Sequence, residues 1–274
     1  MTTEERKEQF AAAYKTVITS DKFKCLLKLR TSATLRRFSL GNLVNLMFQS
    51  EIEERPMPTL LKTYKGWLKL ERQVQQCEKC WYVLAPNKYT KEEEDGTKST
   101  YLTGWHFIAE FDVSQTEGEP LPEDPPDLTT ADHLEQHLWL TEWAYFEHGT
   151  PIRWSDTTGG AKGWYDPEKN EITLREDLSV DESLTVLVHE LIHSMGVDYK
   201  EYSREDAECI TETACAIVCM GLGLDETDQA VNYVSHWAGQ DPERGLKLLG
   251  TAEKFARQLE NALAKNPIQR EEAA

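Results

Sequence analysis

The hydrophobic pattern of the first part of the chain predicts two helices and two strands. Apolar residues recur at helical spacing over about residues 4–19 and again from Leu40 to Ile52. Apolar and aromatic runs bounded by turn residues, at 81–86 and 106–113, are typical of strands, and a hydrophilic stretch separates them. This order predicts a small α+β domain in residues 1–113.

A segment rich in proline and acidic residues follows. Residues 114–127 contain four prolines and five acidic residues. Proline lacks a backbone N–H and interrupts both helices and strand ladders, so neither element is expected here. We interpret residues 114–127 as a linker, which leaves residues 128–274 as a second domain.

The pattern after the linker predicts a helix, a strand and a second helix. Apolar residues at helical spacing cover 130–147, glycines interrupt the chain at 159–163, and residues 171–175 alternate as in a short strand. Ser179, followed by acidic residues at 181 and 182, is a good helix start, because serine caps a helix and negative charge is favourable in its first turn.

The second of these helices contains the sequence His-Glu-x-x-His, from His189 to His193. Four residues are slightly more than one helical turn, so the two histidines share a face and can bind one metal ion. Glu190 lies beside that face, where it can act as the catalytic base on a metal-bound water. The pattern indicates a metallopeptidase-type site with a divalent ion, most simply Zn²⁺, with Mn²⁺ or another divalent ion as the alternative. Two packed structural histidines are the other interpretation.

A catalytic zinc needs a third protein ligand and an open position. A later helical run offers Glu208 and Glu212, spaced i, i+4. We expect Glu208 to be the ligand and Glu212 to accept the free N–H of a ligand histidine. The reverse assignment stays open.

The remaining histidines and the cysteines are expected to be structural. Two cysteines, Cys77 and Cys80, form a single C-x-x-C, which is a structural zinc site only if Cys25 or a histidine joins them. The histidines outside the motif are His106, His133, His137, His148 and His236.

Charge is distributed unevenly along the chain. The net charge is −18, yet residues 1–112 hold 18 basic and 15 acidic side chains, so the rest carries 12 and 33. One window near the N-terminus has no acidic residue and is a candidate anion site: it contains Lys22, Lys24, Lys28, Arg30, Arg36 and Arg37. No stretch is long and apolar enough to span a membrane and the first residues are charged, so we expect a cytoplasmic protein without membrane partners.

A second basic stretch in the same part of the chain is interleaved with aromatic residues. Single-stranded DNA is held by basic grooves and by aromatic faces on which bases stack. The alternative is that the aromatic residues fill a small core. The stretch comprises Lys62, Tyr64, Lys65, Trp67, Lys69, Arg72, Lys79, Trp81 and Tyr82.

Several motifs in order resemble the ArdC-type antirestriction proteins of plasmids and phages. The family's Ser-x-x-Asn-x-x-x-Ile-x-x-Gln helix is similar to Ser39, Asn42, Asn45 and Gln49, and its Trp and Gly-Arg-x-Val elements are similar to Trp67, Arg72 and Val74. Its Lys-Gly-Glu-Lys-Gly turn is similar to the segment around Glu78 and Lys79, with Cys77 and Cys80 in place of the two glycines. GWYDPEKNEITL, HELIH and the Glu208–Glu212 element complete the resemblance.

The resemblance implies an N-terminal single-stranded-DNA-binding domain followed by a zincin-like metallopeptidase domain. On that basis single-stranded DNA is the expected partner. The implied DNA-binding residues are Lys22, Lys24, Lys28, Arg30, Arg36, Arg37, Asn42, Asn45, Gln49, Lys65, Trp67, Arg72 and Lys79. Two alternatives stay open: a DNA-binding protein with a structural metal that acts by occupancy, and a peptidase that cleaves a specific host protein. In the enzyme, the strand at Ile172–Leu174 is expected to align an extended peptide by edge pairing.

Overall fold

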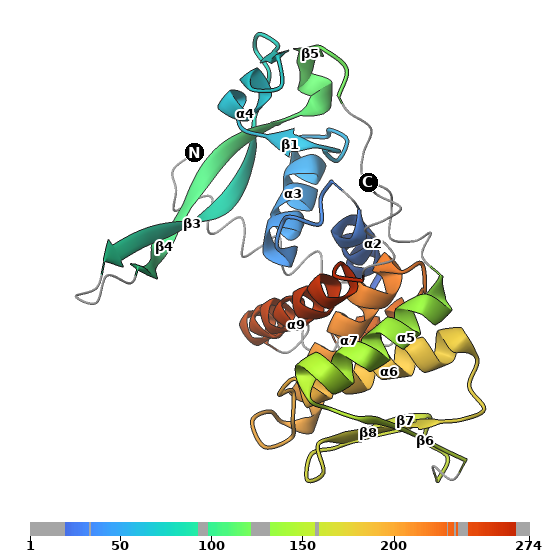
Figure 1. Ribbon diagram of the computed structural model, residues 1–274. Helices are drawn as coiled ribbons and strands as arrows, with labels where there is room; N and C mark the ends of the chain where they lie inside the picture. Colours follow the sequence, from blue (N-terminus) through green and yellow to red (C-terminus); the bar gives the residue numbers. More distant parts are fainter. Residues whose placement is uncertain are drawn as a thin grey trace. The chain divides into compact units, whose positions relative to one another are not determined.

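The computed structural model places the chain in two compact units (Figure 1). It describes residues 20–32, 34–92, 98–121, 132–156, 159–228, 230–232, 234 and 241–266. The N-terminal unit is built from residues 41–121, and the C-terminal unit from residues 20–40 together with 132–266. Helices and strands occur in both units, so the fold is mixed α/β. The helix predicted at residues 4–19 lies outside the described residues.

A long antiparallel hairpin dominates the N-terminal unit. Strand β3 (Trp81–Glu92) pairs with β4 (Lys98–Asp112), and the short β1 (Leu61–Lys62) pairs with the end of β4. Both hairpin strands continue well past the apolar runs that predicted them. Their polar outer halves extend the ladder because antiparallel pairing needs no apolar side chains.

The first residues of the predicted linker belong to the N-terminal unit. A 3-10 turn at Val113–Gln115 is capped by Asp112, and β5 (Thr116–Gly118) then pairs with β2 (Arg72–Val74). The linker prediction was therefore wrong for residues 114–118. The prolines that motivated it begin only at residue 120 and do not reach the paired backbone.

Helices and a small sheet form the described part of the C-terminal unit. Its helices are α2 (Ser20–Thr31), α5 (His133–Trp143), α6 (Val180–Ser194), α7 (Arg204–Gly221) and α9 (Pro242–Leu263), and a π-helical turn at Ala144–His148 continues α5. The strand order is β6 (Ile152–Ser155), β8 (Glu171–Arg175), β7 (Gly163–Asp166). β8 runs parallel to β6 and antiparallel to β7, and α6 lies across β7 and β8 (Figure 1).

Helix α2 belongs to the C-terminal unit, although it precedes the whole N-terminal unit in sequence. It packs on α7. Arg30 is completely buried and donates two hydrogen bonds to the Glu260 carboxylate of α9, at 3.0 and 2.8 Å. The expectation that residues 1–113 form one domain therefore fails for residues 20–40, whose apolar face needs the C-terminal helices for burial.

Within the described residues, no helix combines the length and the apolar character needed to cross a membrane.

Candidate metal centre

Helix α6 presents the His-Glu-x-x-His residues from a well-fixed position. Ser179 accepts a hydrogen bond from the Glu182 backbone, and the Glu182 carboxylate bonds back to Ser179, a capping box that satisfies the free N–H groups of the first turn. Apolar residues of α6, among them Leu187 and Leu191, are fully buried. This packing sets the rotation of the helix and so the direction of His189 and His193.

Three side chains converge as a metal site requires. The ligand atoms of His189, His193 and Glu208 all lie within 4.8 Å of one another. His189 Nε2 is 3.9 Å from Glu208 Oε2. Two ligands about 2.1 Å from a tetrahedral ion lie about 3.4 Å apart, so a small inward shift brings this set to zinc geometry. The residues present therefore fit a divalent ion.

Neighbouring groups orient both imidazoles. His193 Nδ1 donates to the Val197 carbonyl at 2.8 Å, which leaves Nε2 free for a metal. His189 Nδ1 lies 3.5 Å from Glu212 Oε1. The Tyr199 hydroxyl donates to the Glu208 carboxylate at 2.6 Å. Such outer contacts fix the tautomer of a ligand histidine and the direction of a ligand carboxylate.

Glu190 lies buried beside this cluster. Burial raises the pKa of its carboxyl to about 7, a hydrogen bond from the Tyr165 backbone opposes the shift, and the charges of Glu208 and Glu212 add to it. In the same environment, burial and the neighbouring His193 lower the pKa of His189 to about 3, so that imidazole is neutral, as a metal ligand must be. Glu190 thus has both the position and the proton affinity of a general base at neutral pH.

A cavity of about 430 Å³ opens over the cluster. Both histidines, Glu190 and Glu208 line it on the helical side, and Trp164 and Tyr165 of β7 line it on the sheet side. The edge-pairing prediction for Ile172–Leu174 was wrong, because β8 is the central strand and its backbone is already paired on both sides. β7 is the edge strand beside the cavity. Local alternation revealed a strand but could not reveal its place in the sheet.

The other histidines within the described residues serve the structure. His133 bonds to Asp181 and to the Leu222 carbonyl, His137 bonds to Ser183, and His148 bonds to Ser194. All three join α5 or its π-helical continuation to neighbouring parts of the C-terminal unit, chiefly to α6. His106 is exposed, and His236 lies outside the described residues.

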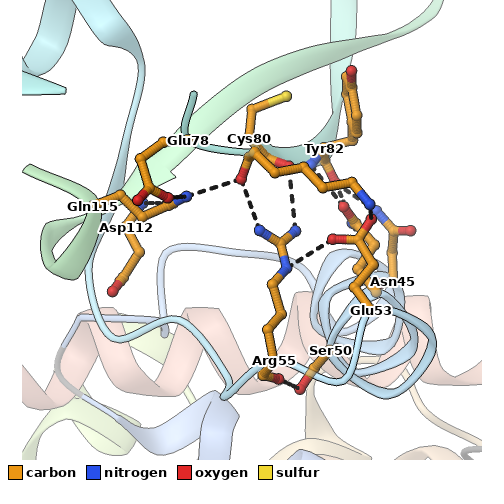
Figure 2. A network of polar contacts seen from close by, with 11 residues as sticks. Asn45, Ser50, Glu53, Arg55, Glu78, Cys80, Tyr82, Asp112 and Gln115 are labelled. Atoms are coloured by element: carbon orange, nitrogen blue, oxygen red, sulfur yellow. Dashed lines mark hydrogen bonds and ion pairs between the residues drawn. The ribbon is translucent and has the colours of Figure 1, made fainter. Parts of the chain in front are cut away.

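Among the described residues, no third ligand joins Cys77 and Cys80. Both are free thiols in a turn held by Arg55, which donates to the carbonyls of Lys79 and Cys80 (Figure 2). The Arg55 guanidinium also stacks over the Trp81 ring. Cys77 has φ of 65°, a left-handed conformation that favours glycine.

The basic window at residues 22–37 is engaged only in part within the C-terminal unit. Arg30 is buried in its ion pair, so it cannot contact DNA as predicted. Lys24 pairs with Asp228, and Lys22 is half-buried. Lys28, Arg36 and Arg37 are exposed, with the Arg37 guanidinium over the Phe38 ring. Residues 41–112 alone hold nine basic and eleven acidic side chains, because half of the eighteen basic ones precede residue 41.

Three amides predicted to bind DNA instead cover an edge of the hairpin. Asn42 bonds to both backbone groups of Leu84, and Gln49 bonds to both backbone groups of Tyr82. Asn45 donates to the Tyr82 carbonyl (Figure 2). These residues of α3 (Leu40–Ile52) satisfy the outer edge of β3 and prevent it from pairing with another strand.

Trp67 and Arg72 also differ from the prediction, whereas Lys79 is exposed. Trp67 is fully buried and donates to the Phe111 carbonyl, which leaves its face unavailable to a base. Arg72 bonds to three carbonyls at or next to β5, and Lys79 pairs with Glu53 at 2.8 Å. Lys65 is exposed on α4 (Tyr64–Leu68). The core interpretation of the aromatic residues holds for Trp67 and Trp81.

Two contributors to the metal centre were missed from the sequence. Tyr165 acts through its backbone N–H on Glu190, and Glu226 lies near Glu212. The GWYD segment before the strand was noticed only as a motif, and a backbone donor leaves no trace in residue type.

Comparison with known proteins identifies one family and one solved fold. Residues 8–119 match the model of the N-terminal domain of anti-restriction factor ArdC. The metal-free crystal structure of the antirestriction ArdC protein from plasmid R388 superposes with a TM-score of 0.53 at 22% identity, over 83% of this chain and 85% of that chain. The Mn(II)-bound structure of that protein gives 0.49 at 22% identity, over 83% and 89%. No curated protein matches the chain.

Proposed function

We propose that this chain, whose residues 8–119 match the ArdC N-terminal domain, is an antirestriction protein of a mobile element, a plasmid or a phage. It binds single-stranded DNA and carries a zincin-like metallopeptidase centre. The observation that carries the enzymatic part is the convergence of His189, His193 and Glu208, with Glu190 buried beside them.

The donor set favours zinc. Two imidazoles and one carboxylate with an open fourth position are typical of catalytic zinc, and Mn²⁺ accepts the same donors less tightly. The contacts of His193 with Val197 and of His189 with Glu212 fix the ligands before an ion arrives. A bound ion would polarise a peptide carbonyl and acidify water at the open position.

The chain's own groups then supply binding and proton transfer. Glu190 accepts the proton of the attacking water and passes it to the leaving nitrogen. The Tyr165 N–H holds the Glu190 carboxylate in place, and the free edge of β7 aligns an extended peptide across the cavity. The walls formed by Trp164 and Tyr165 exclude water from the far side of the peptide.

We place the single-stranded-DNA surface of the N-terminal unit on α4 and its flanks. Lys65 and Lys69 are exposed, Lys62 is half-buried, and Tyr64 is 44% exposed. This surface combines phosphate-binding cations with an aromatic face that can stack on a base. It takes the place of the surface expected from Trp67 and Arg72.

A matched pair of variants tests the peptidase centre. Glu190→Gln keeps the shape of the base but removes its basicity, and Glu201→Gln changes an exposed carboxylate outside the cavity. We expect about one metal ion per chain in both proteins, with peptide cleavage lost only in Glu190→Gln. Equal cleavage by both would remove Glu190 from the mechanism.

DNA binding is tested by titrating single- and double-stranded oligonucleotides at two salt concentrations. We expect a preference for single strands that weakens with salt and is reduced by the combined change of Lys65 and Lys69 to Gln. Metal binding and DNA binding without cleavage of any peptide would favour action by occupancy. Cleavage confined to one host protein would favour a dedicated peptidase.

A further inference from the structure

A second cavity lies on the other side of His189 and Glu190. Its volume is about 230 Å³, and these two residues form a wall that it shares with the larger cavity. The remaining walls come from β7 and α6, from Glu212 and Cys215 of α7, and from Glu226 beyond it. The two cavities therefore adjoin at the proton-transfer group.

Gly163 of β7 lines both cavities. A Cβ atom there would lie 2.6 Å from Val186 Cγ1 of α6 and 2.9 Å from the Thr173 carbonyl of β8, so any side chain would push β7 away from the helix. With glycine, the edge strand lies close to α6 and passes both cavities. A peptide paired with β7 would send successive side chains toward opposite faces, because side chains alternate along a strand.

The two cavities differ in charge. Trp164, Tyr165, Val197 and Tyr199 give the larger one a largely aromatic and apolar lining. The smaller one contains Glu182, Glu212 and Glu226 besides Glu190, and Lys162 is the one cation among its described lining residues. Lys162 pairs with Glu182 at 2.9 Å.

Glu226 is the carboxylate with least compensation. Within the described residues it accepts a hydrogen bond from the Thr185 hydroxyl at 3.4 Å and forms no ion pair. Beyond the Lys162–Glu182 pair, four carboxylates surround the shared wall, those of Glu190, Glu208, Glu212 and Glu226.

We propose that the smaller cavity is a specificity pocket that admits a lysine or arginine side chain of the substrate next to the bond that is cleaved, with Glu226 as its charge partner. This inference rests on the proposed peptidase function and names its substrate class, a polypeptide with a basic residue at that position. A side chain that ends in a cation suits a cavity lined by Glu212 and Glu226, with Val186 and Cys215 beside its aliphatic stem.

The test compares peptides that differ in one side chain. Quenched fluorescent peptides carry lysine, arginine, glutamine or norleucine at each position in turn, and they are offered to the zinc-loaded full chain, to Glu226→Gln and to Glu201→Gln. We expect lysine and arginine to raise kcat/KM about tenfold over norleucine at one position next to the cleaved bond, since a partly buried ion pair supports discrimination of this order. Glu226→Gln should remove that preference, and Glu201→Gln should keep it.

A binding measurement separates the pocket from the chemistry. Fluorescence anisotropy with labelled lysine and norleucine peptides is measured on the full chain and on Glu226→Gln, each without turnover. A lysine preference that Glu226→Gln removes supports the pocket even where no peptide is cleaved, and in that case only the peptidase function fails. Cleavage with equal rates for lysine and norleucine overturns the pocket and leaves the peptidase function standing. Absence of any lysine preference in both cleavage and binding overturns the pocket as well.

Discussion

At the scale of single residues, Glu208 and Glu212 lie one turn apart on α7 and face different nitrogens of the same imidazole. Glu208 is 3.9 Å from His189 Nε2 and Glu212 is 3.5 Å from Nδ1. Removal of a metal ligand abolishes one coordination bond, whereas removal of an orienting carboxylate affects the metal only through the histidine that it holds in place.

We therefore expect Glu212→Ala to weaken zinc binding about 10- to 100-fold and Glu208→Ala to weaken it further. Competition titration with a zinc chelator measures both, with Glu205→Ala, an exposed change in the first turn of α7, as the control. A larger loss in Glu212→Ala than in Glu208→Ala would reverse the two roles.

Cys77 has a left-handed backbone that costs most residues about 1 to 2 kcal/mol and costs glycine almost nothing. Glycine loses more freedom on folding, so Cys77→Gly should raise the free energy of unfolding of the N-terminal unit by at most about 1 kcal/mol. Urea unfolding followed through the hairpin tryptophans measures the change. A decrease would mean that the Cys77 side chain supplies a contact worth more than the backbone strain.

At the scale of elements, α6 is joined to α5 and its π-helical continuation by three histidines, of which His137 is buried. Burial lowers the pKa of His137, which bonds to Ser183, and of His148, which bonds to Ser194. His133 behaves in the opposite way, because its bond to the Leu222 carbonyl and the charge of Asp181 raise its pKa.

The lowered pKa of His137 determines how this residue makes protein stability depend on pH. Its neutral form fits the folded state, so its contribution to stability is complete above the ordinary pKa of 6.5 and is lost as the pH falls toward the folded-state pKa. His137→Gln can still bond to Ser183 but does not titrate. We expect the free energy of unfolding to fall less in this variant than in the wild type between about pH 7.5 and pH 5.5.

Urea titrations at the two pH values give the comparison. The difference between the two proteins isolates His137, because Glu190 and the other titrating groups are common to both. An identical fall in both proteins would show that His137 is not the titrating group.

The local hydrophobic pattern was sufficient to predict those helices and strands whose apolar face is the one buried in the folded protein. The helices at 40–52 and from Ser179 onward, the strand at 171–175 and the His-Glu-x-x-His face were predicted with nearly the observed bounds. The order of β6, β8 and β7, the pairing of β5, and the burial of Trp67 depend on contacts between distant residues. No local pattern contains that information, and a lysine-rich helix has the same sequence whether it faces DNA or a neighbouring helix.

At the scale of the whole molecule, a segment of the C-terminal unit, residues 20–40, precedes the N-terminal unit in sequence. Residues 20–40 lie in the range that matches the ArdC N-terminal domain, yet they complete the helical core that surrounds the metal centre. The contacts of Arg30 tie this early segment to α9: its guanidinium meets Glu260 at 2.8 Å and Glu253 at 3.4 Å. Arg257 adds a hydrogen bond to the Phe38 carbonyl.

Removal of the buried cation should leave the Glu260 carboxylate without this partner, while Glu253 keeps its ion pair with Arg257. We expect Arg30→Met to lower the free energy of unfolding of the C-terminal unit by about 3 to 5 kcal/mol, the usual cost of breaking a buried ion pair from one side. Arg36→Met, at an exposed position, should change it by less than about 0.5 kcal/mol. Amide hydrogen exchange followed by mass spectrometry distinguishes the units. Faster exchange in α7 and α9 with unchanged exchange in the β3–β4 hairpin is the expected result, whereas faster exchange in the hairpin alone would return residues 20–40 to the N-terminal unit.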